Sequence, residues 1–138
     1  MEVLVMETEK RKIKILIIDN HAELVKQIEA RLKMEDDFEV CMVAPLDKLT
    51  ESLIACTPDV LLIDPYAEHS YKYDRIKMAM EMRPTLTVVV LTAVVDVAAS
   101  VRFKKEGVHC VLEKGISSTE LVDSLRKVIV AECEAKTT

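Results

Sequence analysis

This 138-residue sequence contains no tryptophan, and glycine and long apolar runs are scarce in it. Its two glycines, Gly107 and Gly115, provide no glycine-rich turn for a dinucleotide pyrophosphate and no G-x-S-x-G element of a hydrolase. No stretch approaches the roughly 18–20 apolar residues of a membrane-spanning helix. The apolar start at residues 1–6 comes before the first cluster of positive charge, the reverse of a signal peptide. We therefore expect a cytoplasmic protein without membrane contact.

Cysteine pairs with metal-binding spacing are also missing. The four cysteines, Cys41, Cys56, Cys110 and Cys133, include no C-x-x-C pair, and the three histidines are scattered. This pattern disfavours a zinc site. We expect the cysteines to be buried free thiols in a reducing compartment.

An excess of positive charge is absent as well, since the net charge is -5 and the pI is near 5.3. Proteins that bind nucleic acid directly usually carry a basic face, so the composition argues against that partner. Half of the residues are hydrophobic, which suffices for the core of one ordinary domain. We expect residues 1–12 to form a flexible lead-in, residues 13–131 the domain, and residues 132–138 a C-terminal tail.

What the sequence does contain is a regular alternation of strand and helix patterns. Apolar, β-branched runs predict five strands, at residues 13–18, 38–43, 60–63, 87–91 and 108–113. Helical spacing of apolar residues predicts helices at 21–34, 74–82 and 95–106, a short helix after Pro45, and a last helix capped by Ser117. This alternation is typical of an α/β fold with a parallel sheet and helices on both faces. The first, third and fourth strands are expected at its centre, because they are apolar throughout.

The helical patterns also predict which side chains face the core. For the second and fourth helices, the expected inward residues are Leu49, Leu53 and Ile54, then Val97, Ala98 and Val101. Asp47 is a candidate cap for the second helix, and Gly107 is expected to end the fourth.

Polar residues stand at the carboxyl ends of the predicted strands. Asp19-Asn20 follows the first strand, and Asp64, Thr92 and Lys114 follow the third, fourth and fifth. Ligands of open α/β sheets bind at this edge, so these side chains are expected to converge. Carboxylate and amide oxygens suit Mg²⁺, whereas an ammonium and a hydroxyl suit phosphate oxygens. The set therefore indicates covalent catalysis through an aspartyl phosphate.

Four segments in this order resemble the receiver domains of bacterial two-component response regulators. They are Ile-Leu-Ile-Ile-Asp19, Pro58-Asp-Val-Leu-Leu-Ile-Asp64, Val-Val-Val-Leu-Thr92-Ala93, and Gly107 followed seven residues later by Lys114. The resemblance covers residues 13–131. It implies a flavodoxin-like doubly wound fold, (βα)5, with a five-stranded parallel sheet in the order 2-1-3-4-5.

The resemblance also implies roles for individual residues. Asp64 would be the phosphoacceptor. Mg²⁺ would be held by Asp19, Asn20, Asp64 and the backbone carbonyl of Tyr66. The phosphoryl oxygens would be bound by Thr92, Lys114 and the backbone N–H of Ala93. The phosphodonor would be a histidine kinase or a phosphotransfer protein, and a downstream protein would bind the face of the fourth helix, fifth strand and fifth helix.

Several positions depart from the family pattern. Asn20 stands where the family usually has a second acidic residue, which weakens the expected Mg²⁺ site. The segment Pro65-Tyr66-Ala67-Glu68-His69 replaces the usual Met-Pro and glycine, so this loop is expected to differ. Val111 replaces the aromatic residue of the usual Thr–aromatic switch, which Thr92 therefore cannot operate in its common form.

Two functional interpretations remain open. The first is a working single-domain receiver, a signalling domain that catalyses only its own aspartyl phosphorylation and dephosphorylation. The second is a pseudo-receiver, a protein-interaction module that acts without phosphate. Val130 lies beyond the core stripe of the last helix and is compatible with a homodimer.

Alternative roles also remain open for several candidate site residues. Asn20 and His21 are either site residues or simply the start of a helix without a metal role. Asp64 could instead cap a turn, and Lys114 could be a solvated lysine. The tyrosines near Tyr66 form either a partner surface or a cluster packed over the third helix.

Overall fold

The fold is given by a computed structural model, which describes residues 11–67, 70–93 and 95–137, with side chains through residue 131. The expected lead-in therefore lies largely outside the described residues. The helices and strands are β1 (Ile13–Ile18), α2 (Ala22–Lys33), β2 (Phe38–Ala44), the 3₁₀ helix η1 (Leu46–Lys48), α3 (Leu49–Cys56), β3 (Val60–Ile63), β4 (Tyr66–Ala67), β5 (Ser70–Tyr71), α4 (Tyr73–Met82), β6 (Thr87–Thr92), α5 (Val97–Lys105), β7 (Cys110–Glu113) and α6 (Ser118–Thr137).

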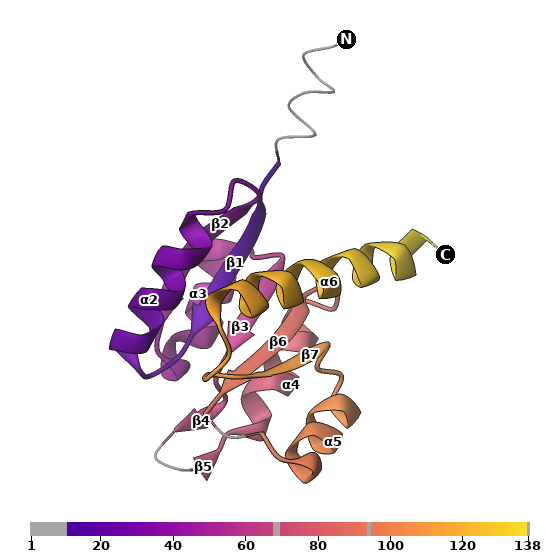
Figure 1. The fold of residues 1–138 in the computed structure, drawn as a ribbon. Helices are drawn as coiled ribbons and strands as arrows, with labels where there is room; N and C mark the ends of the chain where they lie inside the picture. Colours follow the sequence, from indigo (N-terminus) through magenta and orange to yellow (C-terminus); the bar gives the residue numbers. More distant parts are fainter. Residues whose placement is uncertain (1–10, 68–69, 94, 138) are drawn as a thin grey trace.

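Five parallel strands form the central sheet in the order β2-β1-β3-β6-β7. Numbered along the chain, this is the order 2-1-3-4-5, so the predicted flavodoxin-like fold is confirmed. Of the three central strands, β3 and β6 are buried throughout and β1 is buried from Ile15 to Ile18, as their apolar sequences predict. Figure 1 shows the sheet between two layers of helices.

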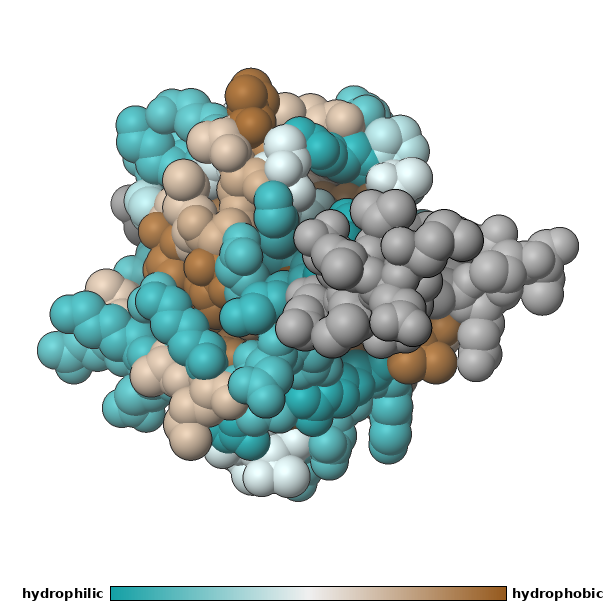
Figure 2. Space-filling model, turned by 90° about the horizontal axis from the view of Figure 1, so that it is seen from above, coloured by the Kyte–Doolittle hydropathy of each residue, from teal (hydrophilic) through white to brown (hydrophobic). Residues whose placement is uncertain are grey.

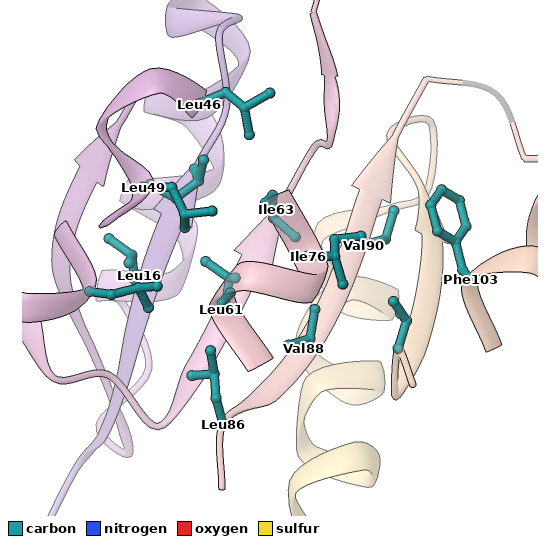
Figure 3. Close-up of a cluster of buried hydrophobic side chains, with 14 of the residues drawn as sticks. Leu16, Leu46, Leu49, Leu61, Ile63, Ile76, Leu86, Val88, Val90 and Phe103 are labelled. Carbon is teal, nitrogen blue, oxygen red and sulfur yellow. The ribbon is translucent and has the colours of Figure 1, made fainter. Parts of the chain in front are cut away.

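Alternate residues of each strand supply two separate cores. In β1, Ile15 and Ile17 pack with α2 and α6, whereas Leu16 and Ile18 pack with α3, α4 and α5. Figure 3 shows the second of these cores, where Leu16, Ile63 and Val90 of the sheet meet side chains of the helices. Because a strand turns successive side chains to opposite faces, one apolar run fills both cores.

The orientation of α5 differs from the prediction. Ala99 and Phe103 are buried, whereas Val97 is 82% exposed and Val101 47% exposed. Ala98 is exposed too, so none of the three residues predicted inward lies in the core. The aromatic ring of Phe103 removes more apolar area from water than a valine does, and it determines which face packs on the sheet.

Two predictions for α3, its inward residues and its cap, also need correction. Leu49 and Leu53 are buried as expected, but Ile54 is 65% exposed. Asp47 lies within η1, and no side chain caps α3 at Lys48.

Gly107 ends α5 in a Schellman motif. Its φ is +96°, a conformation that disfavours residues with a Cβ atom. The N–H of Gly107 donates to the Lys104 carbonyl, and the N–H of Val108 donates to that of Phe103. The chain is thereby turned into β7, as the position of this glycine predicts.

The last helix begins after Ser117, whose Oγ accepts the N–H of Glu120 at 3.1 Å. This bond confirms Ser117 as the cap. The helix continues to Thr137, through most of the segment expected as a tail. Among the described residues, no helix is long and apolar enough to cross a membrane.

The chain after β3 forms a small antiparallel ladder that the sequence analysis did not predict. Tyr66 pairs with Tyr71, and Ala67 pairs with Ser70. Residues 68 and 69 of the unusual loop lie outside the described residues. The ladder lies beside the carboxyl ends of the sheet strands, at the bottom of Figure 1.

Two cysteines are paired, which corrects the expectation of free thiols. Cys41 of β2 and Cys56 of α3 form a disulfide with their Cα atoms 5.9 Å apart. Their separation of 15 residues matches no metal or redox motif, and only the packing of α3 beside β2 brings them together. Cys110 is free and half-buried, and burial raises the pKa of its thiol.

Candidate functional site

Four polar side chains converge at the carboxyl edge of the sheet. Asp19, Asp64 and Thr92 are buried there although their neighbours are apolar. The backbone N–H of Lys114 donates to the Thr92 carbonyl at 2.8 Å, which ties the end of β7 to the end of β6. This edge lies opposite the one that faces the viewer in Figure 2, where hydrophilic teal side chains surround smaller hydrophobic areas.

The ammonium of Lys114 bridges the two carboxylates. Its Nζ lies 2.8 Å from Asp19 Oδ2 and 2.7 Å from Asp64 Oδ2. Burial lowers the pKa of Lys114, but the hydrogen bonds and charges of Asp19 and Asp64 outweigh this effect and raise it. The lysine is therefore charged at neutral pH and belongs to the site rather than to the solvated surface.

The second oxygen of Asp64 accepts two further hydrogen bonds. Its Oδ1 accepts the backbone N–H of Tyr66 at 3.1 Å and the hydroxyl of Thr92 at 3.2 Å. The bond to Tyr66 is the short turn that Asp-Pro predicts, so Asp64 shapes a turn and also lies within the polar cluster. Ala93 directly follows Thr92 and is exposed beside this carboxylate-bearing edge.

His21 joins the cluster from the start of α2. Its Nδ1 lies 3.0 Å from Lys114 Nζ, 3.1 Å from Asp19 Oδ1 and 3.8 Å from Asp64 Oδ2. One ligand atom from each of Asp19, His21 and Asp64 can be chosen so that all three lie within 4.8 Å of one another. Two carboxylates and an imidazole around one ammonium fit a divalent cation in charge and in spacing.

Asn20 lies next to this cluster but makes another contact. Its Oδ1 accepts the backbone N–H of Leu46 at 2.9 Å, in the segment after β2. A cavity of about 320 Å³ adjoins it, and Lys72 and Arg75 are among the lining residues. The structure thus uses the amide oxygen to hold the loop after β2.

The backbone and ring of Tyr66 connect the site to α5. Its hydroxyl accepts a hydrogen bond from Arg102 Nη2 at 2.9 Å, and the Arg102 guanidinium lies 4.4 Å from the centre of the Tyr71 ring. The rings of Tyr66 and Tyr71 pack edge-on against Phe103. These two tyrosines therefore pack on Phe103 of α5, and Tyr71 also contacts the ring of Tyr73 in α4, the third predicted helix.

Glu106 completes this contact by accepting the hydroxyl of Tyr71. Burial, together with this bond to a carboxylate, raises the pKa of Tyr71. Val111, the residue at the usual switch position, packs into the same core from β7. An aliphatic side chain at this position cannot supply the aromatic ring of the usual Thr–aromatic switch. Tyr66 instead links Asp64 to α5, since its backbone N–H binds Asp64 and its hydroxyl binds Arg102.

Sequence reasoning thus identified Asp19, Asp64, Thr92 and Lys114, which the structure brings together. It left the role of His21 open and missed Arg102. The available signal for His21 was its position two residues after Asp19, at the start of a helix. Arg102 carried no signal, because its hydrogen-bond partner Tyr66 lies 36 residues away in the sequence.

Comparison with known proteins identifies the family that the sequence resembles. The family model for the response regulator receiver domain matches residues 15–126 of the chain. A protein-glutamate methylesterase/protein-glutamine glutaminase from Ralstonia nicotianae is 35% identical over 83 residues. That match covers 59% of this chain but only 22% of the length of the methylesterase.

Solved structures that resemble this chain include receiver domains of response regulators. The receiver domain of a NarL regulator from Mycobacterium tuberculosis is 19% identical, with a TM-score of 0.76 over 85% of this chain and 95% of that one. A CheY-like receiver protein from Methanospirillum hungatei is 15% identical, with a TM-score of 0.79 over 90% of this chain and 98% of that one. At these identities the likeness establishes the fold.

Proposed function

The chain belongs to the response regulator receiver domain family, and we propose that it is a working receiver that accepts a phosphoryl group on Asp64 in the cytoplasm. The single observation that carries this proposal is the convergence of two buried carboxylates, a buried hydroxyl and a lysine ammonium at the carboxyl edge of the sheet. Receiver domains are signalling domains, so the expected activity is limited to phosphorylation and dephosphorylation of this one residue.

The chemistry expected is transfer from a phosphohistidine of a histidine kinase or a phosphotransfer protein. An oxygen of the Asp64 carboxylate forms a bond to phosphorus while the bond from phosphorus to the donor imidazole nitrogen breaks. The electron pair of the broken bond stays on that nitrogen, and the imidazole leaves as a neutral base when its other nitrogen carries a proton.

The chain's own residues would stabilise the transferred group. Lys114 is charged and already contacts Asp64, so its ammonium can move to contact a phosphoryl oxygen once Asp64 is phosphorylated. The Thr92 hydroxyl and the Ala93 N–H lie at the end of β6, where they can donate to the other oxygens.

A divalent cation, expected to be Mg²⁺, would offset charge on the phosphoryl oxygens when bound. Asp19, Asp64 and the Tyr66 carbonyl are proposed to hold it, with Asn20 in the position of the usual second acid. Because the Asn20 oxygen holds the Leu46 N–H, we propose that its contribution to the cation is weak.

The same contact of Asn20 favours the second candidate function, a pseudo-receiver. Without a second acidic ligand and with Val111 at the switch position, the fold could serve as a protein-interaction module that needs no phosphate. In either case we propose that the face of α5, β7 and α6 binds the downstream protein. The exposed Val97, Val101 and Val130 on this face are also compatible with a homodimer, which light scattering at high concentration tests directly.

The test is the intact mass after incubation with acetyl phosphate and Mg²⁺. The working receiver predicts a gain of one phosphoryl group in the wild type and none in Asp64→Asn. Asn20→Asp restores the usual acidic pair and is expected to raise the rate at low Mg²⁺. No gain in the wild type at high Mg²⁺, together with a gain in Asn20→Asp, would establish the pseudo-receiver.

A further inference from the structure

The polar cluster already holds one positive charge, because the Lys114 ammonium lies among three atoms that could serve as metal ligands. Its distances are 2.8 Å to Asp19 Oδ2, 2.7 Å to Asp64 Oδ2 and 3.0 Å to His21 Nδ1. Two of these donors are carboxylate oxygens, and the third is an imidazole nitrogen. A carboxylate pair alone suits a hard cation such as Mg²⁺, but an imidazole nitrogen changes the preference of a site.

We propose that His21 is a metal ligand through Nδ1, beside Asp19 and Asp64, and that the site consequently binds a first-row transition-metal dication such as Mn²⁺ more tightly than Mg²⁺. This inference rests on the proposed function, because it concerns the same carboxylates. It assigns the missing ligand to a residue that the family pattern of two adjacent acids does not include.

The positions of Asn20 and His21 explain why a further side-chain ligand comes from His21 rather than from Asn20. The Asn20 oxygen is held by the Leu46 N–H on one side of the turn. The backbone N–H of His21 donates to Asp19 Oδ1 at 2.8 Å, which brings the start of α2 against the carboxylate. The His21 ring is 63% exposed and makes no capping bond. Its Nδ1 lies 3.1 Å from Asp19 Oδ1 and 3.0 Å from Lys114 Nζ, so an ion that displaces the ammonium meets this nitrogen.

Competition with Lys114 follows from this geometry. Asp19, His21 and Asp64 would hold a dication where the ammonium now lies, and its two positive charges would balance the two carboxylates. Lys114 would then be free to contact the phosphoryl oxygens, the role proposed for it above. Removing Lys114 is therefore expected to tighten metal binding, whereas removing His21 weakens it.

The choice of metal follows from the chemistry of the ligands. Nitrogen donors raise affinity along the series from Mn²⁺ toward Cu²⁺, whereas Mg²⁺ takes oxygen ligands and keeps much of its water. The loss of His21 is thus expected to affect Mn²⁺ far more than Mg²⁺. A change in general electrostatics would affect the two ions equally.

The experiment titrates the full chain with Mn²⁺, following the EPR signal of the free ion, and measures Mg²⁺ by competition. The variants are His21→Ala and, as a matched control, Glu23→Ala, which removes an exposed acidic group from the first turn of the same helix. We expect His21→Ala to weaken Mn²⁺ binding about tenfold or more while Mg²⁺ binding changes less than about threefold. Glu23→Ala is expected to change both ions slightly and equally.

Pulsed EPR of the Mn²⁺-loaded wild type gives a second readout, the modulation from a directly bound imidazole nitrogen. It is expected in the wild type and in Glu23→Ala and absent in His21→Ala. Equal losses for both ions, no nitrogen modulation, or no Mn²⁺ binding would each overturn the inference. Phosphorylation without nitrogen coupling refutes this inference alone, whereas nitrogen coupling without phosphorylation refutes only the proposed function.

Discussion

Replacement of Lys114 by methionine leaves two buried carboxylates without their shared cation. The side chains of Asp19 and Asp64 are 4% and 3% exposed, and that of Lys114 is 9% exposed. Removing one partner from a buried ion pair typically costs about 3–5 kcal/mol, because the remaining charge stays desolvated. Methionine keeps most of the apolar stem, so the change isolates the charge.

For a domain of this size, such a loss corresponds to a fall in the melting temperature of about 10–20 °C. The assay is urea and thermal unfolding of the wild type and Lys114→Met at pH 7, with the exposed Lys127→Met on α6 as the matched control. The control is expected to stay within about 0.5 kcal/mol of the wild type.

Two further measurements separate this explanation from a packing defect. In Lys114→Met, the added change Asp64→Asn removes one of the two unpaired charges and is expected to recover part of the lost free energy of unfolding. A divalent cation is expected to stabilise Lys114→Met more than the wild type, because the ammonium no longer competes for the carboxylates.

The pH dependence has a defined sign. Because the pKa of Lys114 is raised above its ordinary value of 10.5, its stabilisation is complete below that pH and is lost as the pH rises through the higher folded value. The difference between wild type and Lys114→Met is thus expected to be constant through neutral pH and to shrink only above about pH 10.5. An effect of Lys114→Met no larger than that of Lys127→Met would refute the reasoning.

Three other changes test contacts elsewhere in the fold. Arg102→Leu removes the hydrogen bond to Tyr66 and the cation–π contact, and is expected to cost about 1–2 kcal/mol in urea unfolding; an unchanged midpoint would contradict it. Gly107→Ala places a Cβ at a φ of +96° and is expected to cost about 1–2 kcal/mol, unlike an alanine at an ordinary helix position. Arg126 hydrogen bonds lower the pKa of Asp37, a stabilisation present above its ordinary value of 3.8 and lost at lower pH, so the stability gap to Arg126→Met should be larger at pH 7 than near pH 3.

The sheet and most of the site were predictable because both follow from strand periodicity. Asp19, Asp64 and Thr92 each end an apolar run, and parallel strands place such ends at one edge. Lys114 could be placed by its position after the fifth predicted strand and by its distance from Gly107. Local sequence is sufficient for these residues.

The orientation of α5 could not be predicted from spacing. Val97 and Val101 lie four positions apart, as do Ala99 and Phe103. Both pairs therefore define an apolar helix face. The choice between the faces depends on how much area the Phe103 ring buries against the sheet and the two tyrosines.

Contacts between distant segments account for the remaining differences. The Asn20 side-chain oxygen accepts a hydrogen bond from the backbone N–H of Leu46, 26 residues away, which no local pattern shows. Cys41 and Cys56 meet only because α3 packs beside β2. The strands β4 and β5 have two residues each, too few for an alternating pattern.

The central claim is that Asp64 itself receives the phosphoryl group. The most direct measurement is tandem mass spectrometry of the acetyl phosphate-treated wild type after borohydride reduction, which converts a phosphorylated aspartate to homoserine. The account predicts conversion at Asp64 and at no other carboxylate, dependent on a divalent cation and absent in Asp64→Asn. Conversion at Asp19 or another residue, or none at Asp64 at saturating cation, would contradict it.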